Sequence, residues 1–163
     1  MTEMKALQGE LNARDFRFGI VLSRFNELVG EQLLAGAVEA LIARGADRSR
    51  IDIVRVPGAF EIPATLEVLA RSAKHDALIA LGAVIRGDTP HFDYVAGECA
   101  RGVAQISVEY ALPIAFGVLT VNTLEQALAR AGATNDANKG AEAALVAIEM
   151  ANLFKRLRAD GVR

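Results

Sequence analysis

The residues best suited to do chemistry lie in one short stretch, residues 84–92 (VIRGDTPHF). Gly87 allows close backbone approach, and a helix with Thr89 as its N-cap and Pro90 at its first position offers free N–H groups and a positive dipole end. The Thr89 hydroxyl adds a hydrogen-bonding group, so this loop predicts a binding site for a single phosphate group. Asp88 lies between Gly87 and Thr89, and its carboxylate would repel the anion unless it points away. A helix cap without a ligand fits these residues equally well.

His91 lies two residues beyond Thr89, beside the predicted anion site. A histidine there can donate or accept a proton near neutral pH. An ordinary surface histidine in the first helical turn is the competing interpretation, and position alone favours it slightly. The second histidine, His75, precedes an apolar run, so we expect it at the opposite end of the strand in a structural role. Cys99 falls in the middle of a helical stretch and predicts a buried packing residue.

Two phenylalanines stand in other short polar segments, Phe25 in residues 23–26 (SRFN) and Phe60 in residues 56–61 (VPGAFE). Aromatic rings in such segments can sandwich a planar ligand, and packing in the core explains them equally well. Asn26 and Glu61 could bind hydroxyl groups, although both residue types are also usual at helix starts.

The pattern excludes several common enzyme classes. Gly82, Gly87 and Thr89 have the spacing of the phosphate loop G-x-x-x-x-G-K-[ST], but Asp88 stands at the lysine position, which excludes a nucleotide triphosphatase. No dinucleotide fingerprint G-x-G-x-x-G follows a predicted strand, and the sequence has no serine elbow G-x-S-x-G. A nicotinamide oxidoreductase and a serine hydrolase are therefore disfavoured.

The elements that must position these residues alternate between short apolar runs and stretches of helical period. Strands are expected at residues 16–23, 51–56, 76–85 and 114–121, and helices at 30–44, 61–73, 90–110, 123–130 and 139–157. The short helix opens with Thr123 and Gln126 at the spacing of a capping box. This order predicts a parallel sheet covered on both faces. Ligands of such sheets bind outside the carboxyl ends of the strands. The three segments above fall there, together with a fourth, residues 120–123 (TVNT).

Composition limits the remaining possibilities. The chain has 163 residues, 52% of them apolar, with 18 Lys and Arg against 20 Asp and Glu. These values predict one folded domain without an electrostatic reason to bind nucleic acid or a membrane surface. One cysteine excludes an internal disulfide and a multi-cysteine metal site. The absence of a long apolar stretch and of a signal peptide leads us to expect a cytoplasmic protein.

Taken together, six segments closely resemble the lumazine synthase family, the 6,7-dimethyl-8-ribityllumazine synthases of riboflavin biosynthesis. They are SRFN, VPGAFEIP, ALGAVIRGDTPHFDYVA, PIAFGVLT, LEQALARAG and NKGAEAALVAIEMANLFK. The resemblance implies an α/β fold, a flavodoxin-like three-layer α/β/α sandwich with a four-stranded parallel sheet, in a single domain of residues 16–158. Residues 1–15 lie outside the alternating pattern and suit either an arm or an extra edge strand, and the resemblance implies that they add a strand to a neighbouring subunit's sheet. It also implies a homo-oligomer, a pentamer or a shell of twelve pentamers.

The resemblance further implies a condensation that uses no metal and no organic cofactor. Its small-molecule substrates are 5-amino-6-(D-ribitylamino)uracil and 3,4-dihydroxy-2-butanone 4-phosphate. His91 would move protons, and Phe25 would stack on the pyrimidine. The other residues assigned to substrate binding are Asn26, Ala59, Phe60, Glu61, Val84, Ile85, Gly87, Asp88, Thr89, Phe116, Arg130 and Lys139. Phe116 and Arg130 would come from the adjacent subunit, and Lys139 and Glu142 match family positions near the same site.

One segment departs from the family pattern. Shell-forming members carry a compact glycine-rich loop with a lysine before the last helix. Residues 132–138 (GATNDAN) are one residue longer and lack the lysine and the second glycine, which favours a free pentamer over a shell. A flavin- or nucleotide-binding protein without catalysis, or a shell protein of the same fold, remains the alternative interpretation.

Overall fold

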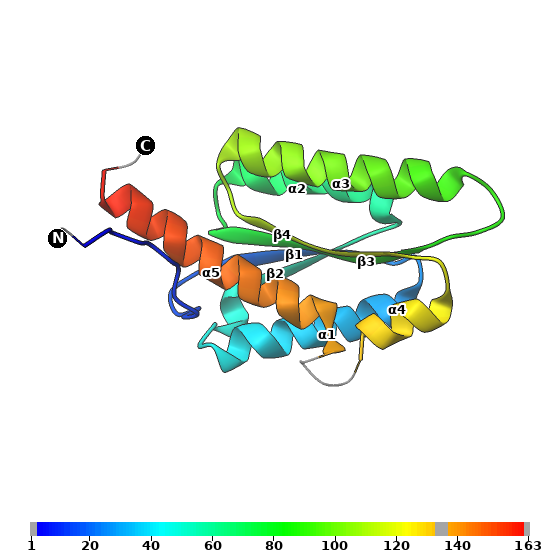
Figure 1. Ribbon diagram of the computed structural model, residues 1–163, viewed down its shortest axis with the longest axis horizontal. Helices are drawn as coiled ribbons and strands as arrows, with labels where there is room; N and C mark the ends of the chain where they lie inside the picture. The colour runs from blue at the N-terminus through cyan, green and yellow to red at the C-terminus, as the bar shows by residue number, and fades with distance from the viewer. Residues whose placement is uncertain (1–2, 133–136, 162–163) are drawn as a thin grey trace.

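The computed structural model describes residues 3–132 and 137–161 and contains one parallel sheet (Figure 1). Its strands are β1 (Phe18–Ser23), β2 (Ile51–Val56), β3 (Ala77–Ile85) and β4 (Ile114–Val121), in the order β2-β1-β3-β4. The helices are α1 (Glu27–Ala43), α2 (Ile62–Ser72), α3 (His91–Tyr110), α4 (Leu124–Arg130) and α5 (Lys139–Ala159). Two 3-10 turns, η1 (Arg48–Arg50) and η2 (Ala59–Glu61), precede β2 and α2. The predicted α/β fold is confirmed.

The sheet is the middle of three layers. Figure 1 shows α2 and α3 on one face and α1, α4 and α5 on the other. Side chains alternate across the sheet, so Ile20 and Leu22 pack against the α1 and α5 layer while Val21 packs against α2 and α3. The central strand β3 is buried from Ala77 to Val84, as its unbroken apolar run predicts.

The sequence-based boundaries agree with the structure to within two residues, except at the start of the first helix. The first helix begins at Glu27, three residues before the predicted residue 30, because Asn26 adopts a left-handed conformation (φ 61°) that turns the chain directly from the strand into the helix. Thr89 is not the N-cap of α3: Pro90 holds that position, and the helix begins at His91. The Thr89 hydroxyl still accepts a bond from the His91 N–H at 3.4 Å.

The described part of the N-terminal segment, residues 3–15, lies along α5 of the same chain. Asn152 donates from Nδ2 to the carbonyl oxygens of Glu10 and Asn12, at 2.8 and 2.9 Å. A Cβ at residue 9 would lie 1.8 Å from the carbonyl oxygen of Glu149, so only glycine fits there. These residues add no strand to the sheet of their own chain. A strand in a neighbour's sheet stays a prediction.

Two expectations concern features that the described residues only partly cover. Residues 133–136 of the loop that departs from the family pattern lie outside the described part of the chain. Among the helices that are described, none combines the length and the hydropathy needed to span a membrane.

Candidate active site

The segments that follow the four strands are tied to one another by hydrogen bonds. The Phe25 N–H donates to the carbonyl of Pro57 at 3.1 Å, joining the turns after β1 and β2. Asn26 donates from Nδ2 to the carbonyl of Ala83 at 2.9 Å, which joins the first turn to β3. The Arg86 N–H donates to the carbonyl of Val121 at 2.8 Å, joining the ends of β3 and β4. These three hydrogen bonds therefore fix the relative positions of all four segments.

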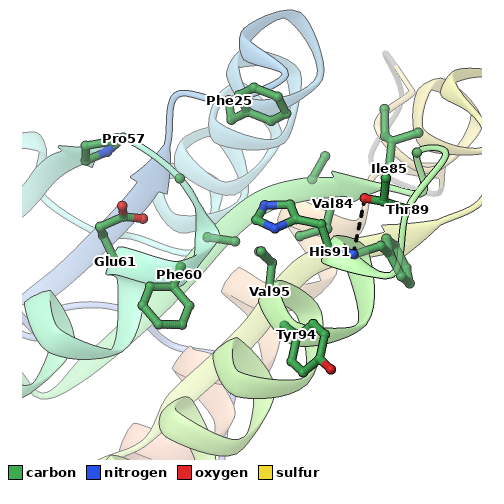
Figure 2. A pocket seen from close by; sticks show the side chains of 15 residues that line it. Phe25, Pro57, Phe60, Glu61, Val84, Ile85, Thr89, His91, Tyr94 and Val95 are labelled. Carbon is green, nitrogen blue, oxygen red and sulfur yellow. Dashed lines mark hydrogen bonds between the residues drawn. The ribbon is translucent and has the colours of Figure 1, made fainter.

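Three of these segments surround a cleft of about 730 Å³ at the carboxyl edge of the sheet (Figure 2). Its walls come from the turns after β1, β2 and β3 and from the first turns of α3. The lining residues are Phe25, Pro57, Gly58, Ala59, Phe60, Glu61, Ala83, Val84, Ile85, Gly87, Thr89, His91, Phe92, Tyr94 and Val95. The position of the cleft agrees with the location predicted for ligands of a parallel sheet.

The two phenylalanines at the cleft are open to solvent. Phe25 is 71% exposed and Phe60 is 61% exposed, so packing in the core does not explain either residue. Large exposed apolar side chains that border a cavity are typical of a binding surface. Figure 2 shows the imidazole of His91 directed toward the centre of the cleft, in the space between these two rings.

The loop between β3 and α3 forms the opposite wall. Gly87, Thr89 and His91 all line the cleft, and a Cβ added at Gly87 would meet nothing within 4 Å. The N-terminal N–H groups of the 20-residue helix α3 begin at the same place. This wall combines backbone donors, a hydroxyl and an imidazole, the groups that an oxyanion and a proton transfer require. Asp88 is exposed and is not among the described residues that line the cleft.

Glu61 and Asn26 have different surroundings. Glu61 ends the turn η2 and lines the cleft, where its carboxylate can accept hydrogen bonds from hydroxyl groups. Asn26 is half-buried and does not belong to the described lining, because its amide is directed to Ala83.

The remaining predicted residues gather elsewhere. Phe116, Arg130, Lys139 and Glu142 line a second cavity of about 470 Å³ beside β4, an edge strand of the sheet. Lys139 and Glu142 form an ion pair at 2.8 Å, and Arg130 donates from Nη1 to the carbonyl of Gln126 at 3.0 Å. The two cavities share no described lining residue. One chain therefore contains both groups of predicted residues without bringing them together.

Other reactive side chains lie far from the cleft. Cys99 is fully buried, and burial raises the pKa of its thiol to about 11, so the thiol stays protonated at neutral pH. His75 lies at the opposite end of the sheet, as predicted, with Nε2 2.7 Å from an oxygen of Asp52. Within the described residues, no group of three His, Cys, Asp or Glu side chains is arranged to hold a metal ion.

The sequence reasoning missed two sets of residues. Pro57, Gly58, Ala83, Phe92, Tyr94 and Val95 also line the cleft. Tyr94 and Val95 stand three and four positions after His91, which is the spacing of one helix face and would have predicted them. The second set is Arg86 alone, a positive charge next to Gly87 that the sequence analysis did not single out. Its guanidinium turns to the ring of Phe92, with Cζ 4.4 Å from the ring centroid.

Comparison with known protein families supplies the last observation. The family model described as 6,7-dimethyl-8-ribityllumazine synthase matches residues 15–155, a span that includes every residue of both cavities.

Proposed function

The chain belongs to the 6,7-dimethyl-8-ribityllumazine synthase family, and from that premise we propose that it is a transferase that condenses 5-amino-6-(D-ribitylamino)uracil with 3,4-dihydroxy-2-butanone 4-phosphate. The product is 6,7-dimethyl-8-ribityllumazine, and the other products are one phosphate and two water molecules. The observation that carries the proposal is the pairing of exposed aromatic rings, Phe25 and Phe60, with a wall that carries Thr89 and His91 in the same cleft. Such a site suits one planar and one phosphorylated substrate.

The aromatic side of the cleft would bind the pyrimidine. Phe25 stacks on the ring, and its exposure leaves the face of its own ring free to do so. Phe60, Ala59 and Glu61 hold the heterocycle and the ribityl chain. The Glu61 carboxylate accepts hydrogen bonds from the hydroxyl groups of the ribityl chain. Asn26 has committed Nδ2 to Ala83, which leaves Oδ1 as its acceptor for the ribityl chain.

The apolar floor and the loop after it would complete the pocket. Val84 and Ile85 contact the heterocycle, and the backbone of Gly87 and Asp88 with the Thr89 hydroxyl binds the phosphate of the second substrate at the start of α3. The Asp88 carboxylate, which is exposed, would point to solvent rather than to the anion.

The reaction would proceed in three stages. The 5-amino group attacks the ketone carbon and loses one water to form an imine. The phosphate then leaves with the electrons of its C–O bond, after a proton is lost from the neighbouring carbon. The resulting enol tautomerises, which turns the hydroxyl-bearing carbon of the second substrate into a carbonyl. The ribitylamino nitrogen finally attacks this carbonyl and closes the ring, and a second water is lost. His91 would carry protons in these stages, and alignment of the two substrates would supply much of the acceleration.

We further propose that each active site is shared between two subunits. None of the described residues that line the first cleft is a lysine or an arginine, although a phosphate dianion needs a cation. Arg130 and Lys139 line the second cavity, together with Phe116 of the edge strand β4. In a closed ring such as a pentamer, each subunit would present this edge to the His91 cleft of its neighbour.

An assay with both substrates tests the proposed function. Incubation of the purified protein with the two substrates should give the absorbance of the lumazine together with one equivalent of inorganic phosphate. Protein that binds the pyrimidine or a flavin and releases no phosphate would instead be the non-catalytic binding protein considered above. Sedimentation of the same sample distinguishes a pentamer from a shell of twelve pentamers.

A further inference from the structure

The segment that carries His91 has few interactions of its own. Residues 87–91 are all exposed, and the N-cap of α3, Pro90, provides no side-chain hydrogen bond within the described structure. The bond from the His91 N–H to the Thr89 hydroxyl is long, at 3.4 Å. A helix start with so little capping is prone to fray. Catalysis by His91 nevertheless requires a defined position for its imidazole.

Arg86 supplies the missing interactions from the end of β3. Its guanidinium lies over the ring of Phe92, with Cζ 4.4 Å from the ring centroid, and Nη1 is 3.6 Å from an oxygen of Asp93. Both partners belong to the first turn of α3 and follow His91 directly. On its other side, Nε donates to Oδ1 of Asn122 at 3.0 Å. One planar group thus joins α3 to the turn between β4 and α4.

The Asn122 end of this bridge is held independently of Arg86. The Asn122 N–H donates to Oε1 of Gln126 at 2.7 Å, and the Gln126 N–H donates to the hydroxyl of Thr123 at 3.1 Å. These bonds fix the start of α4 through its own cap. Loss of the Arg86 guanidinium would therefore leave α4 in place and release the first turn of α3.

We propose that Arg86 is a positioning residue for the reaction: its guanidinium ties the first turn of α3 to Asn122 and thereby fixes His91 in the cleft. Arg86 does not belong to the described lining of the cleft, so it acts through Phe92 and Asp93 rather than on the substrates. Lysine cannot replace it, because an ammonium group cannot lie flat on the ring and direct a side-on N–H to Asn122 at once. The kinetic effect rests on the proposed function.

Kinetics of Arg86→Gln and Arg86→Lys test this role. We expect kcat to fall by about 10- to 100-fold in both variants, the scale of a small misplacement of a catalytic group. KM for the pyrimidine should change less than threefold, since Phe25 and Phe60 belong to other segments. Arg101→Gln is the matched control, because Arg101 is an exposed arginine of the same helix that forms an ion pair with Glu98 at 2.6 Å. A kcat of Arg86→Gln within twofold of that control would overturn the proposal.

Asn122→Ala provides a second variant in case Arg86→Gln fails to fold. It removes the acceptor of the bridge and leaves Arg86 in place. It should lower kcat in the same direction, and the double variant should lose no more than the worse single variant, because both changes break one bridge. Fully additive losses would show that the two residues act separately and would contradict the proposal.

Mixed assemblies locate the defect in one half of the shared site. Arg86→Gln subunits should restore activity when reassembled with Arg130→Ala subunits, because they provide an intact Arg130. They should not restore activity to His91→Ala subunits, because neither chain then provides a well-placed His91. Recovery in the second mixture, or none in the first, would contradict the assignment of Arg86 to the His91 half.

The position of His91 can also be read without any substrate. The His91 imidazole proton resonances, identified by their loss in His91→Ala, should move in Arg86→Gln and stay unchanged in Arg101→Gln. The buried His75 at the far end of the sheet serves as an internal reference. If the wild-type protein forms no lumazine, the proposed function fails, while this spectrum still decides whether Arg86 positions His91.

Discussion

Asn26 and Ala83 are joined by a hydrogen bond of 2.9 Å from the side-chain amide of Asn26 to the main-chain carbonyl of Ala83. This bond holds the turn after β1 against the last residues of β3. The exposed ring of Phe25, next to Asn26 in that turn, lines the same cleft as Val84 and Ile85 at the end of β3. Asn26 forms this bond from a left-handed backbone conformation (φ 61°), which asparagine adopts more readily than most residues. The aromatic wall of the cleft thus depends on a residue that does not line it.

Phe25→Ala should weaken binding of the pyrimidine substrate by roughly 1–2 kcal/mol through lost stacking area. Affinity for the butanone phosphate, which has no ring, should hardly change. Titration calorimetry with each substrate measures both values. Leu28→Ala is the matched control, since Leu28 is 65% exposed on α1 and lies outside the described cleft lining. Equal losses for both substrates would point to a folding defect instead of stacking.

His91→Ala should lower the turnover number by about 10- to 1000-fold, the usual contribution of one general acid or base. Substrate affinity should change far less, because the proposed site assigns binding of the phosphate and the pyrimidine to other groups. The thermal midpoint should stay close to that of the wild type, since His91 is exposed at the helix start. Steady-state kinetics with a saturating second substrate measures the effect. An unchanged turnover number would remove His91 from the mechanism.

Subunits that carry His91→Ala and subunits that carry Arg130→Ala should restore each other's activity when they are unfolded and reassembled together. With random mixing in a ring, about one quarter of the interfaces pair an intact His91 with an intact Arg130. Activity should rise toward that fraction of the wild-type value. Each variant reassembled alone is the control. Mixed rings as inactive as either parent would show that both residues serve a site within one subunit.

Asp52→Asn should reduce stability at neutral pH, by about 1 kcal/mol or less because the carboxylate is partly exposed. The pKa of Asp52 lies below its ordinary value of 3.8, mainly because its carboxylate accepts a hydrogen bond from Arg17 and secondly because it is hydrogen-bonded to His75. A carboxyl group whose pKa is lower in the folded state stabilises the fold at pH values above its pKa in the unfolded state. This contribution is lost as the pH falls through the pKa of the folded state.

Denaturant unfolding of the wild type and of Asp52→Asn at pH 7 and at pH 3 measures this contribution. The difference between the two proteins should be smaller at pH 3. Asp88→Asn is the control, since Asp88 is exposed in the loop before α3. A difference that grows toward acid would mean that the Asp52 carboxylate does not stabilise the fold.

Local pattern in the sequence was sufficient for the elements and their order. Strands β2 and β4 have the bounds that their apolar runs predict, and α4 begins as its capping residues predict, with the Gln126 N–H bonded to the Thr123 hydroxyl at 3.1 Å. Periodicity and capping involve residues within a few positions of one another, so the sequence reports them directly. The parallel sheet follows from that alternation, and with it the edge at which a ligand site was expected.

Only the tertiary structure decided which side chains of that edge are free and which are engaged. The pattern of residues left Phe25 and Phe60 equally suited to the core and to a binding surface, and their exposure depends on how distant segments pack. The strand order β2-β1-β3-β4 also decides two further relationships. It brings Arg86 between Phe92 and Asn122, and it separates Arg130 from the His91 cleft. These relationships join residues from different strand and helix units, and no local periodicity encodes a contact between segments that meet only when the chain folds.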